Sequence, residues 1–448
     1  MFTLDNKTIL VIGLGKTGIS IINFAYKNFK NCKIIATDSK PMERLSKEFH
    51  AVKKYISVLT LGEHKAEDFT SADIIFVSPG VDLTRLSFAP SFSKDIINDI
   101  ELAYRVSKIN FIGITGSNGK STTTKLVFEM INSKKRPAVI CGNYGNPILD
   151  EMMKQENIAN FVCELSSFQL ENIVEFSPQI SLFLNLSEDH LDRYPTFDAY
   201  INAKKNIFLN IKSNSIIVYN LDDPLVSEIV KEKTCIKYSF SWTRKGDIYS
   251  ENNIIYLNNN EFGDLKFSLS RCSLRGKHHI ENIMAAILTA LTLKTDPAQV
   301  QSTIDNFIGI PHRTEFVKEI KGVAFYNDSK ATNVGATLKA IESFEKNIIL
   351  IAGGKDKGGA LEELMLPVRQ RVKLLFLIGE AKERFYEFFK TTTTCIKCST
   401  FSEAILKSKQ MANSGDTVLF SPACSSYDMF KNFEERGNIF KNLVREES

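Results

Sequence analysis

Residues 110–122 read Asn-Phe-Ile-Gly-Ile-Thr-Gly-Ser-Asn-Gly-Lys-Ser-Thr, an apolar run that ends in a glycine-rich loop. The run Phe111 to Thr115 is rich in β-branched residues, which is typical of a buried strand. Glycines followed by a Lys-Ser pair surround a polyphosphate with backbone N–H groups, place the lysine on its β- and γ-phosphates, and direct the hydroxyl to Mg²⁺. The predicted nucleoside triphosphate site is therefore Gly116-Ser117-Asn118-Gly119-Lys120-Ser121-Thr122.

This loop departs from the general phosphate-binding pattern at one position. The general pattern has a glycine five residues before Gly119, where this chain has Ile114. The first glycine is Gly116, so the loop is a shortened version. A chance match is the alternative, but the strand before the loop and Asn118 within it argue against one.

A second glycine motif lies near the N-terminus. Gly13, Gly15 and Gly18 follow the apolar run Thr8 to Ile12 and precede a stretch suited to a packed helix. Such glycines allow a tight turn and let backbone N–H groups approach a phosphate. Asp38 ends the next predicted strand, where a carboxylate can hold a sugar hydroxyl. The motif predicts a nucleotide site, with NAD as the first candidate, and helix–sheet packing is the alternative role for the glycines.

Two polar residues follow later apolar runs of the central region. Glu164 lies at the end of the run that starts at Phe161, and His190 follows the run Ile180 to Leu186. In parallel sheets, ligands bind beyond the carboxyl ends of strands, where the phosphate loop also opens. A carboxylate and an imidazole there could hold a second divalent ion; the alternative is that each is a hydrogen-bonded structural residue.

Lys204 lies on the apolar face of a predicted helix. Thr196 is a suitable N-cap, and Lys204 is four residues from both Tyr200 and Phe208, which belong to the apolar stripe. Its neighbour Lys205 falls off that stripe. A lysine that faces inward has a depressed pKa and can be an uncharged amine near neutrality. The alternative is a stem that lies along the apolar surface while the ammonium reaches water.

Three loops in the last third of the chain carry cations, hydroxyls and backbone N–H groups directly after predicted strands. Such loop ends suit a small anionic substrate, although turns after strands are rich in these residues in any case. The loops are Asn327 to Asn333, Gly353 to Lys357 and Ser421 to Ser426.

The composition is that of a globular protein. Hydrophobic residues make up 43% and charged residues 24%, which allows a sizeable core. A net charge of +4 without a dense basic run argues against nucleic acid as a partner. No apolar stretch reaches the roughly 20 residues that span a bilayer. Asp5 and Lys7 precede any apolar run and the eight cysteines are scattered, so we expect a cytoplasmic protein.

Strands that alternate with helical segments predict parallel sheets, and 448 residues exceed one ordinary core. We therefore expect an α/β protein of three consecutive domains: a Rossmann-like domain at 1–105, a central P-loop mononucleotide-binding domain at 106–309 and a Rossmann-like domain at 310–448. Further expected strands are Lys33 to Thr37, Asp73 to Ser78, Val323 to Tyr326, Asn347 to Ala352, Leu374 to Ile378 and Thr417 to Phe420, with a helix from about Ile280 to Leu293.

Taken in order, these motifs resemble those of the Mur ligases. The likeness covers essentially the whole chain, and the shortened phosphate loop is the form found in that family. Two stretches, Asn327 to Gly335 and Lys431 to Glu434, resemble the members that add D-glutamate. The motifs that carry the resemblance are Gly13-Leu14-Gly15, Gly116 to Thr122, Glu164 to Leu170, Asp189 to Pro195, His312-Arg313, Asp328 to Asn333 and Ser421 to Gly437.

The resemblance implies an ATP-dependent ligase of peptidoglycan precursor synthesis. It implies that a carboxylate of UDP-N-acetylmuramoyl-L-alanine attacks the γ-phosphoryl group of ATP and forms an acyl phosphate. The amine of D-glutamate then displaces phosphate. The resemblance also implies two Mg²⁺ sites and a monomer that does not insert into membranes.

The resemblance also assigns roles to individual residues. For the uridine-linked substrate the matching residues are Lys16, Thr17, Asp38, Ser39, Gly80, Asn143 and His190. For the adenine nucleotide, beyond the phosphate loop, they are Asn282, Arg313 and Asp328. The implied metal ligands are Ser121, Glu164, His190 and Lys204, and the implied catalytic residues are Lys120, Glu164, His190 and Lys204. The residues that match the D-glutamate pocket of the family are Thr332, Lys357, Ser426, Tyr427 and Phe433.

Lys204 matches a lysine that the family carries as a carbamate. CO₂ adds to a neutral amine and leaves an anion that can reach Mg²⁺, which agrees with an inward-facing amine. Three positions depart from the family pattern and leave the details of the substrate contacts open. Lys16 replaces an apolar residue, Tyr427 replaces a leucine, and Gly354-Lys355-Asp356-Lys357 is rearranged from Gly-Asp-Gly-Lys.

Other functions stay open at this level. A NAD-dependent dehydrogenase would account for Gly13 to Gly18 and Asp38, but it leaves the phosphate loop unexplained. A ligase for another amino acid, or a folate polyglutamate synthase, would keep the central domain and change the third. A nucleotide-binding regulator without catalysis would not need Glu164, His190 and Lys204 together.

Overall fold

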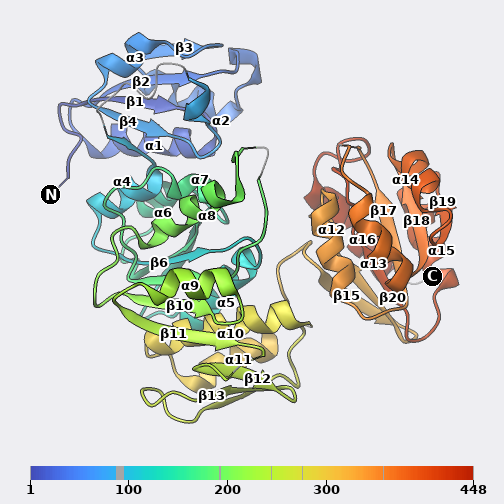
Figure 1. Ribbon diagram of the computed structural model, residues 1–448. Helices are drawn as coiled ribbons and strands as arrows, with labels where there is room; N and C mark the ends of the chain where they lie inside the picture. The colour runs from blue at the N-terminus through green and yellow to red at the C-terminus, as the bar shows by residue number, and fades with distance from the viewer. Residues whose placement is uncertain are drawn as a thin grey trace. The chain divides into compact units, whose positions relative to one another are not determined.

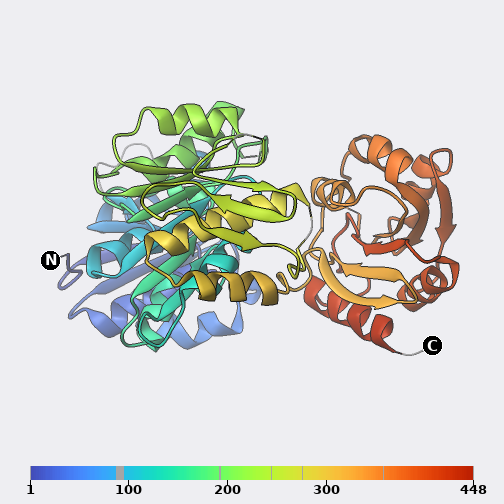
Figure 2. The same ribbon diagram turned by 90° about the horizontal axis from the view of Figure 1, so that it is seen from below.

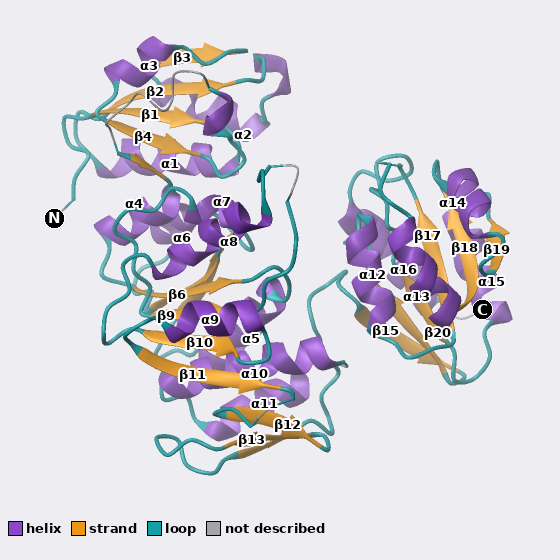
Figure 3. Ribbon diagram, viewed as in Figure 1, coloured by secondary structure: helices purple, strands orange, loops and turns teal. Residues whose placement is uncertain are grey.

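The structure, a computed structural model, describes residues 2–86, 95–190, 193–243, 245–274, 276–356 and 358–446. The chain forms two compact units, which are described separately (Figures 1 and 2). Unit 1 contains Met1–Leu269 and Glu281–Thr303, and unit 2 contains Ser270–Ile280 and Ile304–Ser448. Unit 1 is built on two β-sheets and unit 2 on one, with helices packed against them (Figure 3).

The first sheet of unit 1 is parallel throughout, in the order β3-β2-β1-β4-β5. Its middle strand β1 is an apolar run because both faces of the sheet are covered. β1 pairs with β2 on one side and β4 on the other, and a reversal of strand order of this kind leaves a crevice at the carboxyl ends. The main elements are β1 (Thr8–Ile12), α1 (Lys16–Asn28), β2 (Lys33–Asp38), α2 (Lys47–Val52), β3 (Val58–Leu61), α3 (Ala66–Ser71), β4 (Ile74–Val77), β5 (Ile96–Ile97) and α4 (Asp99–Val106).

The central sheet has the order β14-β13-β12-β11-β10-β9-β6-β8-β7. It is parallel from β7 to β12 and ends in an antiparallel extension, β12 to β14. β6 lies between β8 and β9, so the loops that follow these three strands open at the same edge. The strands are β6 (Asn110–Thr115), β7 (Ala138–Gly142), β8 (Asn160–Glu164), β9 (Ile180–Phe183), β10 (Ile216–Asn220), β11 (Ile236–Ser241), β12 (Ile248–Glu251), β13 (Ile254–Leu257) and β14 (Lys266–Ser268); the helices are α5 (Lys120–Ile131), α6 (Ile148–Lys154), α7 (Ser167–Leu170), α8 (Phe197–Lys205), α9 (Pro224–Lys231), α10 (Lys277–Thr292) and α11 (Pro297–Asn306).

The sheet of unit 2 has the order β15-β16-β20-β17-β18-β19, and only the β15–β16 pair is antiparallel. Side chains of β17 alternate between two cores: Ile348 and Leu350 pack with α12, α13 and α14, whereas Ile349 and Ile351 pack with α15 and α16. β20 lies between β16 and β17, which brings the loops after these three strands to one edge. The elements are β15 (Glu315–Ile320), β16 (Val323–Asn327), α12 (Val334–Glu342), β17 (Ile348–Gly353), α13 (Glu362–Arg371), β18 (Val372–Ile378), α14 (Lys382–Phe389), β19 (Thr394–Lys397), α15 (Phe401–Met411), β20 (Thr417–Phe420) and α16 (Phe433–Arg445).

The predicted α/β fold class is confirmed, and the predicted strands lie close to observed ones. The expected run Ile180 to Leu186 is too long, because β9 ends at Phe183 and the chain then turns toward the phosphate loop. Strands β3, β5, β7, β15 and β19 escaped the sequence analysis, and β7 matters because Asn143 follows it. The domain boundaries expected at 105/106 and 309/310 stay predictions. Within the described residues, no helix has the length and apolar character needed to cross a membrane.

Candidate active site

The phosphate loop connects β6 to α5 and is held from several sides. Gly116 and Gly119 have φ values of 151° and 82°, a region that favours glycine. A Cβ on Gly119 would lie 2.3 Å from Oδ1 of Asn282, so this residue of α10 packs directly against the loop. The backbone N–H of Asn118 donates to Oδ1 of Asn185 over 2.8 Å. The loop conformation therefore depends on both glycines, and the predicted nucleotide contact Asn282 lies beside it.

Two lysine side chains converge on one carbonyl oxygen of this loop. Nζ of Lys120 and Nζ of Lys204 each donate to the carbonyl oxygen of Gly116, both over 2.8 Å. Lys120 also donates to the carbonyl oxygen of Ser117 over 2.9 Å. Two cations at one acceptor repel each other, which favours loss of a proton from the more deeply buried amine.

Lys204 is the more deeply buried of the two, with only 1% of its surface exposed. Its Nζ lies 4.8 Å from the centre of the Tyr200 ring. Burial, and then the charge of Lys120, lower the pKa of Lys204 well below its ordinary value, against the opposing charges of Asp189 and Glu164. The prediction of an inward-facing lysine is confirmed, and its ammonium does not reach water as the alternative required.

Glu164 presents an unsatisfied carboxylate oxygen at the end of β8. The residue is 3% exposed, and its Oε1 accepts a hydrogen bond of 2.7 Å from Nδ2 of Asn143. Its Oε2 has no hydrogen-bond partner among the described residues. A buried polar atom left in this state costs about 1–3 kcal/mol, and a hard cation with oxygen ligands would satisfy it. Together with the buried hydroxyl residue Ser121 in the first turn of α5, this oxygen fits Mg²⁺.

His190 is positioned by aromatic contacts and remains 44% exposed. Its ring centre lies 4.9 Å from that of Phe168 and 6.3 Å from that of Tyr200, the ring that also lies beside Lys204. Across the parts of the chain that the structure describes, no three His, Cys, Asp or Glu side chains form a ready-made metal site. An ion bound near Glu164 would therefore need ligands of other kinds, such as hydroxyls or a modified lysine.

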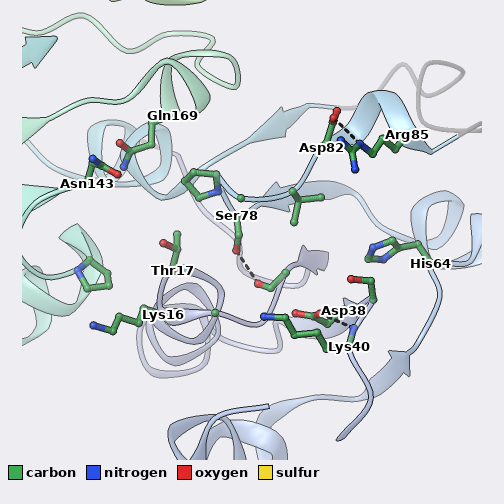
Figure 4. Close-up of a pocket in the computed structure, with 18 of the residues that line it drawn as sticks. Lys16, Thr17, Asp38, Lys40, His64, Ser78, Asp82, Arg85, Asn143 and Gln169 are labelled. Carbon is green, nitrogen blue, oxygen red and sulfur yellow. Dashed lines mark hydrogen bonds and ion pairs between the residues drawn. The ribbon is translucent and has the colours of Figure 1, made fainter. Parts of the chain in front are cut away.

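A cavity of about 710 Å³ opens at the carboxyl ends of β1 and β4 and reaches residues that follow β7 (Figure 4). Its volume suits a ligand the size of a nucleotide. Figure 4 shows Asn143 and Gln169 on the side away from Asp38 and Lys40. Apart from His190, every residue predicted to contact the uridine-linked substrate lines this cavity: Lys16, Thr17, Asp38, Ser39, Gly80 and Asn143.

Four further lining residues were not predicted from the sequence. Lys40 and Arg85 add positive charge beside Lys16, although Arg85 is paired with Asp82 at 3.1 Å. His64 and Gln169 add ring and amide donors. Lys40 carried a sequence signal through its place just after Asp38, and Gln169 through its place in the motif Glu164 to Leu170. Arg85 and His64 come from segments whose position depends on the tertiary fold.

The glycines of the N-terminal turn differ in how closely other atoms pack against them. A Cβ on Gly18 would lie 2.0 Å from the carbonyl oxygen of Gly13, and one on Gly13 would lie 2.8 Å from Val81. These two glycines are therefore needed for close packing. In contrast, a Cβ on Gly15 would meet no atom within 4 Å, and Gly15 lines the cavity.

Asp38 clamps this turn, a role that sequence reasoning missed. Its Oδ2 accepts the backbone N–H of Leu14 over 2.7 Å, and its Oδ1 accepts that of Lys40 over 2.9 Å. Both carboxylate oxygens are thus engaged by the backbone, and the residue is 7% exposed. A ligand hydroxyl would have to share an oxygen with one of these donors.

The Asp38→Asn variant should therefore weaken both the turn and the cavity. An amide offers one acceptor oxygen and sets an NH₂ group against a backbone N–H, so we expect a loss of about 1–3 kcal/mol in the free energy of unfolding. Urea unfolding measures this loss. Binding of a uridine nucleotide, followed by calorimetry, should weaken as well, while ATP binding should change little. Unchanged stability would show that Asp38 does not clamp the turn.

In unit 2, Asp328 joins two loops in a buried network. Its Oδ1 accepts the backbone N–H of Thr314 over 3.0 Å, and its Oδ2 accepts the Ser421 hydroxyl over 2.7 Å. Burial raises the pKa of Asp328 to about 7, partly offset by these hydrogen bonds and the Arg313 charge. Nε of Arg313 is buried without a partner among the described residues. The two predicted nucleotide contacts of this unit therefore lie together.

The described residues among those predicted to bind D-glutamate belong to the loop edge of the same sheet. Ser426 is buried, Phe433 begins α16, and Thr332 lies in the loop after β16. Tyr427 is 68% exposed, so its side chain takes no part in the buried network. Lys357 lies outside the described residues.

Three family models match the chain in succession. The Mur ligase MurD-like N-terminal domain matches residues 7–97. The Mur ligase middle domain matches residues 114–290, and the Mur ligase glutamate ligase domain matches residues 312–424. These matches fall on the three sheets in order.

Full-length relatives are similar to the chain from end to end. A UDP-N-acetylmuramoylalanine–D-glutamate ligase of Geotalea uraniireducens (strain Rf4) is 41% identical over 445 residues, which is 98% of this chain and 97% of the relative. A protein of the same name from Clostridioides difficile (strain 630) is 40% identical over 98% of this chain and 99% of the relative.

Solved structures agree on the fold. A pseudomurein peptide ligase type C from Methanothermus fervidus matches with a TM-score of 0.58 at 18% identity, covering 98% of this chain and 99% of that one. A MurF ligase from Thermotoga maritima, in complex with ADP, matches with a TM-score of 0.57 at 16% identity, covering 99% and 96%. At these identities the likeness supports the three-domain architecture alone.

Proposed function

The chain belongs to the Mur ligase family, and on that premise we propose that it joins D-glutamate to UDP-N-acetylmuramoyl-L-alanine in peptidoglycan precursor synthesis, with conversion of ATP to ADP and phosphate. The observation that carries the proposal is the likeness, over 98% of the chain, to relatives named for this reaction. The loop at Gly116 and the lysines that converge on it supply the chemistry that such a ligase needs.

The reaction has two steps. A carboxylate oxygen of the precursor attacks the γ-phosphorus of ATP and ADP leaves, which gives an acyl phosphate. The amine of D-glutamate then attacks the acyl carbon, loses a proton and expels phosphate. The amide bond forms at the expense of one phosphoanhydride bond.

Lys120 is proposed to hold the transferred phosphoryl group. Its Nζ bonds two loop carbonyls, from which it can turn to phosphate oxygens as negative charge builds up on them. Bound Mg²⁺ would neutralise further phosphate charge, and we propose two such ions. Ser121, Glu164 and His190 would hold them, and the orphan oxygen of Glu164 supports this assignment.

Lys204 is proposed to carry a carbamate. The lone pair of a neutral Nζ adds to CO₂, and loss of a proton leaves a carboxylate on the side chain. Burial beside Lys120 favours the neutral amine that this step needs. The resulting anion would replace a buried neutral amine with a group that can serve as a metal ligand.

The cavity at β1 and β4 is proposed to bind the UDP moiety. Backbone N–H groups at Gly15 and the N-terminus of α1 suit a diphosphate, as do the cations Lys16 and Lys40. Asn143 lines this cavity and also contacts Glu164, so it connects the precursor with the phosphoryl-transfer site. His190 would contact the part of the precursor that lies between this cavity and the phosphoryl-transfer site.

Unit 2 is proposed to bind D-glutamate. Thr332, Lys357, Ser426, Tyr427 and Phe433 would contact the amino acid. Arg313 and Asp328 are proposed as adenine-nucleotide contacts within unit 2, and Asn282 is proposed as one within unit 1. We also propose that the protein works in the cytoplasm, as a monomer.

Phosphate release from ATP tests the proposal. The assay contains UDP-N-acetylmuramoyl-L-alanine and offers D-glutamate, L-glutamate, L-alanine or no amino acid in parallel. Release that requires both the precursor and D-glutamate is the expected result. Release with another amino acid would keep the mechanism and identify a sibling ligase, whereas no release in any condition would indicate a nucleotide-binding protein without catalysis.

A further inference from the structure

Arg436 is the largest fully buried side chain of the described residues, with 0% of its surface exposed. It lies in the first turns of α16, and its guanidinium donates to no carboxylate among the described residues. The charge of Asp428 offsets this cation only in part, because no ion pair joins the two among the described residues. Burying such a cation is costly, and an apolar residue of similar volume is often as stable or more stable. A buried cation at this position therefore indicates a role other than packing.

The guanidinium connects two loops of the sheet edge. Nε donates to the Ser329 hydroxyl over 3.0 Å, and Nη2 donates to the Ser329 carbonyl oxygen over 2.8 Å. Nη1 and Nη2 both donate to the carbonyl oxygen of Cys424 over 3.1 Å. Ser329 lies in the loop after β16 and Cys424 in the loop after β20, so one side chain sets the spacing between them.

The same guanidinium lies against the third loop of that edge. A Cβ on Gly354 would lie 3.2 Å from Nη1 of Arg436 and 2.5 Å from the carbonyl oxygen of Ser425. Gly354 follows β17 and has a φ of 138°. The planar fork of arginine thus meets all three loops, and the ring of Phe420 lies 5.6 Å from its central carbon.

The loops that Arg436 holds are those that carry Thr332, Ser426 and the start of α16. The Ser329 hydroxyl links the loop after β16 to the start of α16, because it donates to the carbonyl oxygen of Phe433 over 2.8 Å. We infer that Arg436 is a positioning residue that sets the geometry of the amino-acid pocket without touching the amino acid. This inference rests on the proposed function, since it takes D-glutamate as the ligand of that pocket.

Arg436→Lys tests the inference in the full-length chain. A lysine keeps the charge but cannot bond Ser329 and Cys424 from a planar fork, so the loops lose their fixed spacing. Steady-state phosphate release should show a KM for D-glutamate raised by about tenfold or more, as expected for loops displaced by a fraction of an ångström. The KM values for ATP and for the UDP-linked precursor should stay within about twofold of wild type.

The matched control is Lys441→Met on the same helix. Lys441 anchors α16 to Glu315 of β15 at 3.1 Å, and it makes no hydrogen bond or ion pair with the described residues of the three loops. It should lower stability without changing the KM for D-glutamate. If Lys441→Met raises that KM as much as Arg436→Lys does at equal loss of stability, Arg436 only anchors the helix and the inference is wrong.

Two further variants keep the test decisive. Ser329→Ala removes one acceptor of Arg436 and the bond to Phe433, but it keeps the bonds of the guanidinium to the carbonyl oxygens of residue 329 and Cys424. It should therefore fold and raise the same KM by about threefold. Arg436→Ala should regain affinity for D-glutamate with added ethylguanidinium but not with ethylammonium. An unchanged KM in folded Arg436→Lys or Ser329→Ala would overturn the inference. Wild-type protein without D-glutamate-dependent release would instead overturn the proposed function.

Discussion

Replacing Lys120 by alanine should abolish D-glutamate-dependent phosphate release while the protein stays folded. The proposed role of Nζ is to meet charge that develops on the transferred phosphoryl group, and the loss of one such donor costs about 10²–10³ in kcat. Lys120 also carries a full charge, so we expect a loss at the upper end of this range or beyond. The measurement is phosphate release at saturating substrates.

Folding of the Lys120→Ala variant should be close to wild type. The bonds of its Nζ to the carbonyls of Gly116 and Ser117 are only partly buried, and Lys120 itself is half-buried, so their loss should cost little stability. The control is Lys125→Ala on the same helix, which removes a partly exposed ion pair with Glu129 at 2.9 Å and should leave turnover unchanged. Substantial activity in Lys120→Ala would contradict the assignment of the loop.

Replacing Lys204 by alanine should reduce turnover by a similar factor, for a different reason. The proposed carbamate supplies a buried anion close to Lys120 and Glu164, and its loss leaves a metal ligand missing. Removing a buried, largely uncharged side chain leaves a cavity that a small anion can enter. Added short-chain carboxylates such as acetate or propionate should therefore restore part of the activity.

The rescue separates a carbamate from a plain amine. Lys205→Ala, one residue further along α8, should behave as wild type and gain nothing from carboxylates. Wild-type activity should also fall when CO₂ and bicarbonate are stripped from the assay and return when they are added. A Lys204→Ala variant that carboxylates cannot rescue would count against the carbamate, although Lys204 could still act as an amine.

Several parts of the site could be predicted from the sequence because local patterns determine them. The shortened loop after β6 requires glycines at positions with positive φ, and these glycines can be recognised directly in the sequence. The burial of Lys204 follows from its spacing to Tyr200 on one helix, a relation of a few residues along the chain. Helical periodicity therefore carried a functional prediction, and the structure confirms the inward orientation.

Other parts were beyond sequence reasoning because they involve partners far apart in the chain. The clamp of Asp38 on the turn at Leu14 joins two separate strand ends. The burial of Arg436 depends on carbonyl oxygens of Ser329 and Cys424, which have no residue-type signature. Every residue has a backbone carbonyl oxygen, so no sequence pattern identifies the ones that accept the bonds of Arg436.

The sequence alone determined the strands before the two glycine turns, the turns themselves and the residue types at the ends of the predicted strands. These depend on side-chain volume, branching and glycine conformations, which act over a few neighbouring residues. The tertiary structure alone decided the order of the strands. Because β6 lies between β8 and β9, the Glu164 oxygen without a hydrogen-bond partner is at the same edge as the phosphate loop, to which Lys120 and Lys204 donate hydrogen bonds. That order is a property of packing between distant segments, and packing is what brings separate motifs into one site.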